Sequence, residues 1–150
     1  MAHKDWLDSL ESEVASGQIT VQERDTPWFD LICRRFPVRA SGICWERLPT
    51  TQYRQHSEPH LSVVAHENEI REFLSEFGVH AGLTLDSRCV VIGDNTTSVA
   101  LEMKFHVLLE AITRLLAEPQ SLYVIAKDGE WCFAFTFEED MYYAKSLVTY

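Results

Sequence analysis

The sequence lacks the short motifs that mark most nucleotide-binding and hydrolytic sites. Its six glycines never cluster as GxGxxG or GxxxxGK, and neither GxSxG nor HExxH occurs. A phosphate-binding loop needs closely spaced glycines so that backbone amides can approach the phosphates, and HExxH places two zinc-binding histidines on one face of a helix. The sequence therefore predicts no catalytic residue and no cofactor, and we expect a protein that is not an enzyme.

Cysteine and histidine are also too widely spaced for a structural zinc site. The best candidate set is Cys33, Cys44, His56 and His60, in which only the two histidines have finger-like spacing. The cysteines of a zinc knuckle are usually separated by two to four residues, whereas Cys33 and Cys44 are far apart in the chain. We predict no metal site and expect both histidines to be solvated in a loop.

Long hydrophobic runs are missing as well. No apolar stretch approaches the ~18 residues that span a bilayer, and the early segment DWLDSLESEVASG is acidic and amphipathic, unlike a secretory signal. Cys89 and Cys132 lie in the apolar runs CVVI and WCFAF, where a free thiol behaves as a small buried hydrophobic group. We therefore expect a cytoplasmic protein with unpaired thiols and no membrane contact.

Basic residues are scarce. The chain has 13 lysines and arginines against 23 aspartates and glutamates, which gives a formal net charge of −10. Such a charge repels nucleic acid and anionic membranes and speeds the encounter with basic partners, although it can also serve solubility alone. The only basic cluster, Arg34, Arg35 and Arg39, is too small for a nucleic-acid-binding face, so no nucleic-acid partner is expected.

The sequence does contain alternating segments of helical and strand periodicity. Several predicted strands are joined by short turns, which predicts the α+β class: a single domain over residues 1–150 with a largely antiparallel sheet and helices packed on one face. Segment 49–60 is polar, contains two prolines and is expected to be a long exposed loop. The predicted helices are 5–17, 27–36, 66–78 and 106–119, and the predicted strands are 19–23, 61–65, 89–94, 98–105, 121–126 and 131–137.

The last two strands are predicted to form a hairpin with an aromatic face. Asp128-Gly129 is a dipeptide that tolerates the backbone of a tight two-residue turn. Trp131, Phe133, Phe135 and Phe137 alternate along the second strand, so their side chains share one face of the sheet. Four aromatic side chains on one face are expected to pack in the core against the helices.

Two acidic clusters stand out beside these elements. Glu69, Glu72 and Glu76 share the side of the predicted helix 66–78 that lies opposite its apolar stripe, where like charges three and four residues apart cost helix stability. They indicate either simple solvation or a surface that receives a cation. The second cluster is the run 138–140, Glu-Glu-Asp, directly after the aromatic strand, where charges can also serve only to limit sheet extension.

The C-terminal stretch SLYVIAKDGEWCFAFTFEEDMYYAKS resembles the closing hairpin of several small bacterial immunity proteins. These are cytoplasmic antidotes encoded beside polymorphic or contact-dependent growth-inhibition toxins. The resemblance implies a protein that binds its cognate toxin protein, often a nuclease with a basic cleft, and an acidic surface would attract such a cleft electrostatically. A monomer is expected rather than a homo-oligomer. The expected partner-binding residues are Glu69, Glu72, Glu76, Glu138, Glu139, Asp140, Tyr142 and Tyr143.

A small acidic secretion chaperone or scaffold is the alternative function. Such proteins have a similar size and fold class and hold a segment of an effector. A chaperone is expected to expose an apolar groove and to bind an unfolded stretch, whereas an immunity protein is expected to bind a folded enzyme.

Overall fold

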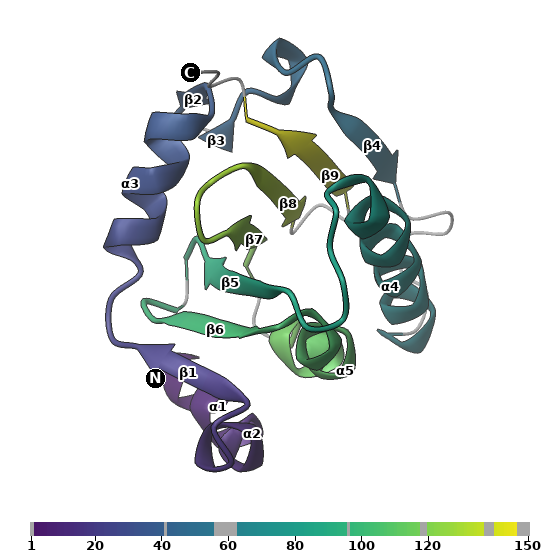
Figure 1. Cartoon of the computed structure of the whole chain (residues 1–150). Helices are drawn as coiled ribbons and strands as arrows, with labels where there is room; N and C mark the ends of the chain where they lie inside the picture. The colour runs from purple at the N-terminus through teal and green to yellow at the C-terminus, as the bar shows by residue number, and fades with distance from the viewer. Residues whose placement is uncertain are drawn as a thin grey trace.

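A computed structural model of the chain describes residues 2–40, 42–55, 63–95, 97–117, 120–136 and 140–146. Its central feature is an antiparallel seven-stranded sheet with the strand order β1-β6-β5-β7-β8-β9-β4 (Figure 1). The predicted α+β class with an antiparallel sheet is confirmed. The strands are β1 (Ile19–Gln22), β4 (Gln52–Gln55), β5 (Arg88–Gly93), β6 (Ala100–Lys104), β7 (Leu122–Ala126), β8 (Trp131–Phe135) and β9 (Asp140–Lys145).

Helices cover both faces of this sheet, and not one face as predicted. The first face carries α1 (Ala2–Ser9), α2 (Glu11–Ala15), α4 (Val63–His80) and α5 (Phe105–Leu115). The second carries α3 (Thr26–Arg35), a small hairpin of β2 (Val38–Arg39) and β3 (Gly42–Ile43), and the 3-10 turn η1 (Trp45–Arg47). The physical reason is that β5, β7 and β8 are apolar on both sides, so an uncovered face would expose their side chains to water.

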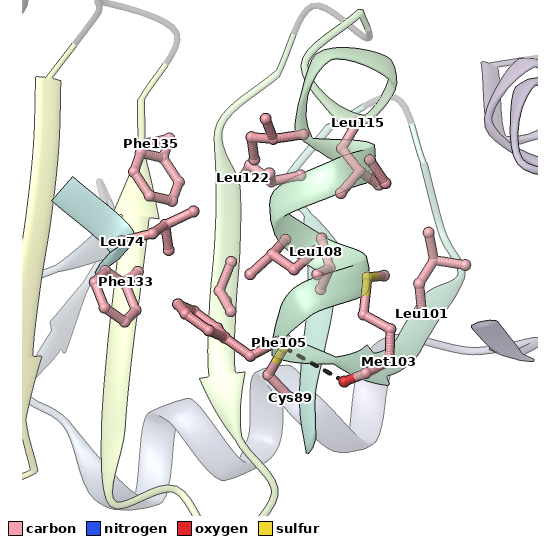
Figure 2. Packing of buried hydrophobic residues seen from close by; sticks show 14 of the residues in the cluster. Leu74, Cys89, Leu101, Met103, Phe105, Leu108, Leu115, Leu122, Phe133 and Phe135 are labelled. Atoms are coloured by element: carbon pink, nitrogen blue, oxygen red, sulfur yellow. Dashed lines mark hydrogen bonds between the residues drawn. The ribbon is translucent and has the colours of Figure 1, made fainter. Parts of the chain in front are cut away.

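The larger core lies between the first face and helices α4 and α5. Phe133 and Phe135 belong to this core, as the alternation in the sequence predicts (Figure 2). Phe73 of α4 packs edge-on against both, at 6.0 and 6.2 Å between ring centroids. Trp131 belongs to the same core, whereas Phe137 lies outside the described residues. Cys89 is fully buried here, and burial raises the pKa of its thiol to about 12, which makes it an inert packing group.

The smaller core lies on the second face. Its central members are Val90 and Ile92, which alternate with Cys89 and Val91 of the first face along β5. They are covered by Ile32 and other apolar side chains of α3 and of the segment that follows it. Both cores thus share the same strands, and the sheet is the common wall between them. The remaining buried members are Phe36, Ile43, Leu48, Ala100, Ile125, Cys132 and Ala144.

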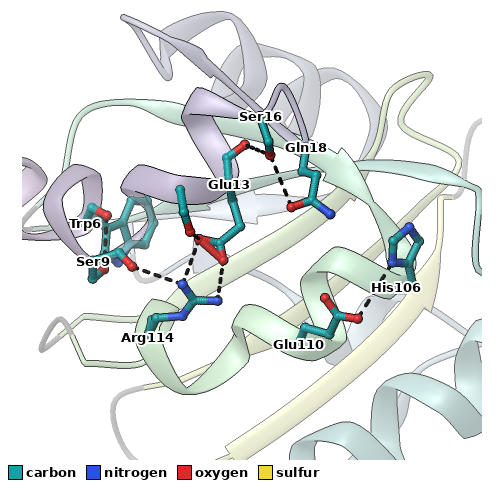
Figure 3. A network of polar contacts seen from close by, with 9 residues as sticks. Trp6, Ser9, Glu13, Ser16, Gln18, His106, Glu110 and Arg114 are labelled. Atoms are coloured by element: carbon teal, nitrogen blue, oxygen red, sulfur yellow. Dashed lines mark hydrogen bonds and ion pairs between the residues drawn. The ribbon is translucent and has the colours of Figure 1, made fainter.

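Polar contacts fasten the N-terminal helices to α5 (Figure 3). The indole nitrogen of Trp6 donates to the carbonyl of Leu115 at 3.1 Å, although these residues are distant in sequence. Arg114 of α5 donates to the carbonyl of Ser9 at 3.0 Å and forms an ion pair with Glu13 at 2.7 Å. The Arg114 guanidinium holds the pKa of the Glu13 carboxyl at about 2, chiefly through the hydrogen bond between the two side chains.

Two predicted segments have a different structure. Residues 52–55, expected to belong to a loop, form β4, which pairs with β9 and is the edge strand at that end of the sheet. All four side chains of β4 are exposed, so no apolar pattern marks it as a strand. Residues 63–65, expected to end a strand, form the first turn of α4. The helix therefore begins before the amphipathic stripe from which it was predicted.

The predicted hairpin is confirmed, with a longer turn. β7 and β8 pair from Leu122 opposite Phe135 to Ile125 opposite Cys132, and residues 127–130 connect the strands. Four residues connect the strands, so the turn is longer than the two-residue type, and Gly129 within it has a positive φ of 77°. The Gly129 amide donates to the carbonyl of Ala126 at 2.9 Å and closes the turn.

The end of β5 is tightly packed around Gly93. A Cβ atom at this position would overlap the amide of the buried Gln120, which donates to the Thr97 hydroxyl at 2.8 Å and accepts from the Thr97 amide at 3.2 Å. We therefore expect Gly93→Ala to lower the free energy of unfolding by about 2 kcal/mol in urea denaturation. The loss should shrink in a Gln120→Ala background, where the overlap is gone, and an unchanged loss would contradict this account.

The ion pair between Glu13 and Arg114 makes a pH-dependent contribution. Because the pKa of Glu13 is lowered on folding from 4.5 to about 2, the stabilisation is fully present above pH 4.5 and is lost as the pH falls toward 2. We expect Glu13→Gln to lower the free energy of unfolding by about 1 kcal/mol at neutral pH. Thermal denaturation between neutral pH and pH 2 should show the difference from the wild type vanish in acid. A difference that does not change with pH would contradict the assigned role of the ion pair.

Candidate partner-binding site

The edge strand β4 is the most open part of the sheet. Gln52 pairs with Tyr143 and Tyr53 with Tyr142 of β9, and no strand pairs with the other side of β4 in the described part of the chain. An edge strand offers backbone donors and acceptors to an incoming chain. We name the side chains around this strand the β4 edge surface: Trp45, Tyr53, Arg54, Glu76, Asp140 and Tyr142.

Three aromatic rings form a row on one side of β4. Trp45 of η1 stacks on Tyr142 with 4.9 Å between ring centroids and 7° between planes, and Tyr142 lies 5.0 Å from Tyr53. Tyr53 ends the row and is 54% exposed. Its hydroxyl donates to the Asp140 carboxylate at 2.8 Å, and this hydrogen bond raises the pKa of Tyr53. The outermost ring is therefore held in place by a ring on one side and a carboxylate on the other.

A cation and a carboxylate lie on the opposite side of the same strand. Arg54 forms an ion pair with Glu76 of α4 at 2.8 Å. Its guanidinium carbon also lies 5.5 Å from the ring centroid of Phe73 and 5.9 Å from that of Phe77. Both contacts join the edge strand to α4, so β4 is anchored to the first face although its own side chains are exposed.

The two tyrosines predicted to bind a partner are separated by the sheet. Tyr142 belongs to the aromatic row, whereas Tyr143 points toward α4 and is 2% exposed. Successive side chains of a strand point to opposite faces, so adjacent tyrosines cannot line one surface. Asp140 lies on the same side as Tyr142, where it meets Tyr53.

The predicted acidic residues are only partly gathered. Glu76 reaches the β4 edge surface through Arg54, and Glu72 is exposed and Glu69 partly exposed on α4. Glu138 and Glu139 lie outside the described residues. Exposed carboxylates also occur far along the chain from this surface, among them Asp30, Asp86 and Glu130. The aromatic row, more than a concentration of charge, therefore distinguishes the β4 edge surface.

Sequence reasoning missed Trp45, Tyr53 and Arg54. They come from segments that are short, polar or irregular, and their proximity depends on the pairing of β4 with β9. The segment Gln52–Gln55 has a single aromatic residue among polar ones, which does not distinguish a strand from a loop.

A pocket of about 230 Å³ lies on the other side of the β4–β9 pair. Its buried floor includes Phe77 and Tyr143, whose rings stack at 5.7 Å between centroids. The Tyr143 hydroxyl is buried and has no hydrogen-bond partner among the described residues. Burial raises its pKa to about 12, so at neutral pH it keeps its proton and can donate a hydrogen bond.

The metal candidate from the sequence is not assembled by the described residues. Cys33 is exposed and Cys44 buried, and both are free thiols, while His56 and His60 lie outside the described residues. No group of three or more histidine, cysteine or acidic side chains in the described ranges is arranged to hold a metal ion. Within the same ranges, no helix has the length and apolar character that crossing a bilayer requires.

Comparison with known proteins adds no family to these observations: neither a protein-family model nor a curated protein matches the chain.

The buried hydroxyl of Tyr143 gives a stability prediction. A buried donor without a partner costs about 1–3 kcal/mol, so Tyr143→Phe should leave the free energy of unfolding unchanged or raise it by about 1 kcal/mol. The matched change Tyr53→Phe removes the exposed hydrogen bond to Asp140 and should lower the free energy of unfolding only slightly. Chemical denaturation of the two variants checks the difference, and a clear loss of stability in Tyr143→Phe would contradict it.

Proposed function

We propose that this chain is an inhibitor of the immunity class, which binds a folded toxin domain with a basic cleft and blocks its activity. The β4 edge surface is the contact area in this proposal. The observation that carries it is the aromatic row, because its outer ring, Tyr53, is 54% exposed on an edge strand and fixed by Tyr142 and Asp140. The resemblance of the C-terminal hairpin to immunity proteins supports the same function.

Exposed aromatic rings that are held in place suit protein binding. Tyrosine and tryptophan supply most of the binding free energy at many interfaces because they bury a large area with few rotatable bonds. The ring of Tyr53 is already ordered by Tyr142 and by the hydrogen bond to Asp140, which reduces the entropy lost on association. The Arg54–Glu76 pair lies on the opposite side of β4, so a partner on the aromatic row reaches that pair only around the edge of the strand.

The charge of the protein selects the kind of partner. A net charge of −10 accelerates encounter with a cationic protein and disfavours nucleic acid itself. In a nuclease cleft, carboxylates such as Asp140, Glu72 and Glu76 can occupy positions otherwise taken by phosphate groups. The carboxylates thus attract the basic cleft and orient the two proteins, and the aromatic row provides the contacts that slow dissociation of the complex.

A secretion chaperone would need a continuous apolar groove. The large hydrophobic side chains that are exposed in the described residues are Val38, Tyr53, Val79 and Leu85, and they lie on four separate segments. This distribution favours binding of a folded partner over binding of an unfolded stretch.

The test is co-expression with the protein encoded by the adjacent reading frame. We expect restored growth, a purified complex, and an affinity that falls as salt concentration rises. Tyr53→Ala should weaken the complex at least tenfold by titration calorimetry, a loss of ~1.4 kcal/mol or more. Leu85→Ala, which removes another exposed apolar side chain, is the control and should have little effect.

A matched pair of charge reversals tests the electrostatic part. Glu72 and Asp30 are both exposed, and Glu72→Lys and Asp30→Lys change the net charge equally. We expect Glu72→Lys to slow association by about tenfold at low salt and Asp30→Lys to have a smaller effect. Equal effects would show that only the overall charge acts, and full activity of Tyr53→Ala would remove the aromatic row from the interface.

A further inference from the structure

The backbone of β9 determines which groups of the edge strand β4 are left free. In an antiparallel sheet, the N–H and C=O groups of successive residues point alternately to the two neighbouring strands. The Thr136 amide donates to the carbonyl of Asp140 at 2.9 Å, so Asp140 faces β8. At the other end of β9 the Ser146 amide donates to the carbonyl of Glu130 at 2.9 Å, which lies on the same side. The even-numbered residues of β9 therefore face β8, and its odd-numbered residues face β4.

The same alternation identifies the backbone groups of β4 that reach no neighbouring strand. Gln52 and Arg54 are opposite odd-numbered residues of β9, so their N–H and C=O groups are directed to that strand. The N–H and C=O groups of Tyr53 and Gln55 are therefore directed away from the sheet. No strand in the described part of the chain pairs with them, and no residue described there forms a hydrogen bond with these backbone groups. Tyr53 and Gln55 thus present free donors and acceptors along the edge.

The other edge strand, β1, is less open than β4. Val21 of β1 packs against the larger core, and the Gln22 side chain accepts a hydrogen bond from the Trp28 indole at 2.8 Å. All side chains of β4 are exposed, and neither proline nor glycine interrupts the strand. An uninterrupted edge with free backbone groups can be extended by a strand from another chain.

The side chains at this edge favour a cationic residue in the added strand. Residues opposite each other in paired strands have their side chains on the same face, so the residue opposite Tyr53 would lie beside its exposed ring. The Tyr53 hydroxyl is bonded to the Asp140 carboxylate, which adds negative charge at the end of that ring. A lysine or arginine is attracted both by the ring and by the carboxylate. The net charge of −10 disfavours a second copy of this chain as the source of the strand.

We propose that the basic partner binds by adding one of its own strands to the edge of β4, with a lysine or arginine opposite Tyr53. This inference rests on the function proposed above and specifies how the β4 edge surface makes its contact. The free backbone groups of Tyr53 and Gln55 form hydrogen bonds with the added strand and fix its register. The Tyr53 ring and Asp140 select the cationic side chain in that register.

The test measures hydrogen exchange of the β4 amides by nuclear magnetic resonance, in the full chain alone and in its complex with the protein encoded by the adjacent reading frame. In the chain alone, the amides of Gln52 and Arg54, which are directed to β9, should exchange slowly and those of Tyr53 and Gln55 fast. In the complex, the Tyr53 and Gln55 amides should exchange at least about tenfold more slowly, because they then donate to the added strand.

Two variants at one position separate the backbone contact from the side-chain contact. Gln55→Pro removes an outward N–H group and none of the groups directed to β9, and an edge strand tolerates proline where its nitrogen faces solvent. We expect this variant to keep its thermal stability and to weaken the complex at least about tenfold. Gln55→Ala keeps the N–H group and should weaken the complex by less than about twofold.

The outcomes that contradict strand addition differ from those that contradict the proposed function. If the complex forms while the Tyr53 and Gln55 amides still exchange fast, or if Gln55→Pro binds as tightly as Gln55→Ala, strand addition is wrong and the proposed function stands. If no complex forms, the proposed function fails and strand addition fails with it. If both amides are already protected in the chain alone, the edge is occupied without the partner, which overturns the inference; a dimer in sedimentation would then identify a second copy as the occupant.

Discussion

The structure depends on a sheet whose central strands are apolar on both faces. Along β5, Cys89 and Val91 are buried toward α4 and α5, while Val90 and Ile92 are buried toward α3. The backbone groups of these strands are satisfied within the sheet, but each row of side chains needs its own cover. The apolar side chains of the helices provide this cover. The surfaces that remain for binding therefore lie at the edges of the sheet, where β1 and β4 end it.

The alternation of side chains along β9 places two different environments on one strand pair. Tyr142 belongs to the row of rings that ends in the exposed Tyr53, and Tyr143, the next residue, lines the pocket beside α4. The aromatic row and the pocket thus lie on opposite sides of β9.

The regular part of the fold could be predicted because its apolar residues have clear periods. The α5 stripe, the β7–β8 hairpin and the aromatic face of β8 follow from the spacing of their own residues. The strand β4 could not, because it is polar on both sides and is a strand only through its pairing with β9. Likewise the position of α3 on the second face follows from the need to cover β5 and β7, which no local pattern in α3 expresses.

The sequence by itself determined the acidic charge, the fold class and most of the buried side chains, since composition and periodicity act locally and need no knowledge of neighbours. Only the tertiary structure decided which exposed groups meet. Tyr53, Tyr142 and Trp45 form a row, Arg54 neutralises Glu76, and the Tyr143 hydroxyl is buried without a described partner. The physical reason is that these contacts join segments brought together by strand pairing and packing, and the register of that pairing is set by both cores at once.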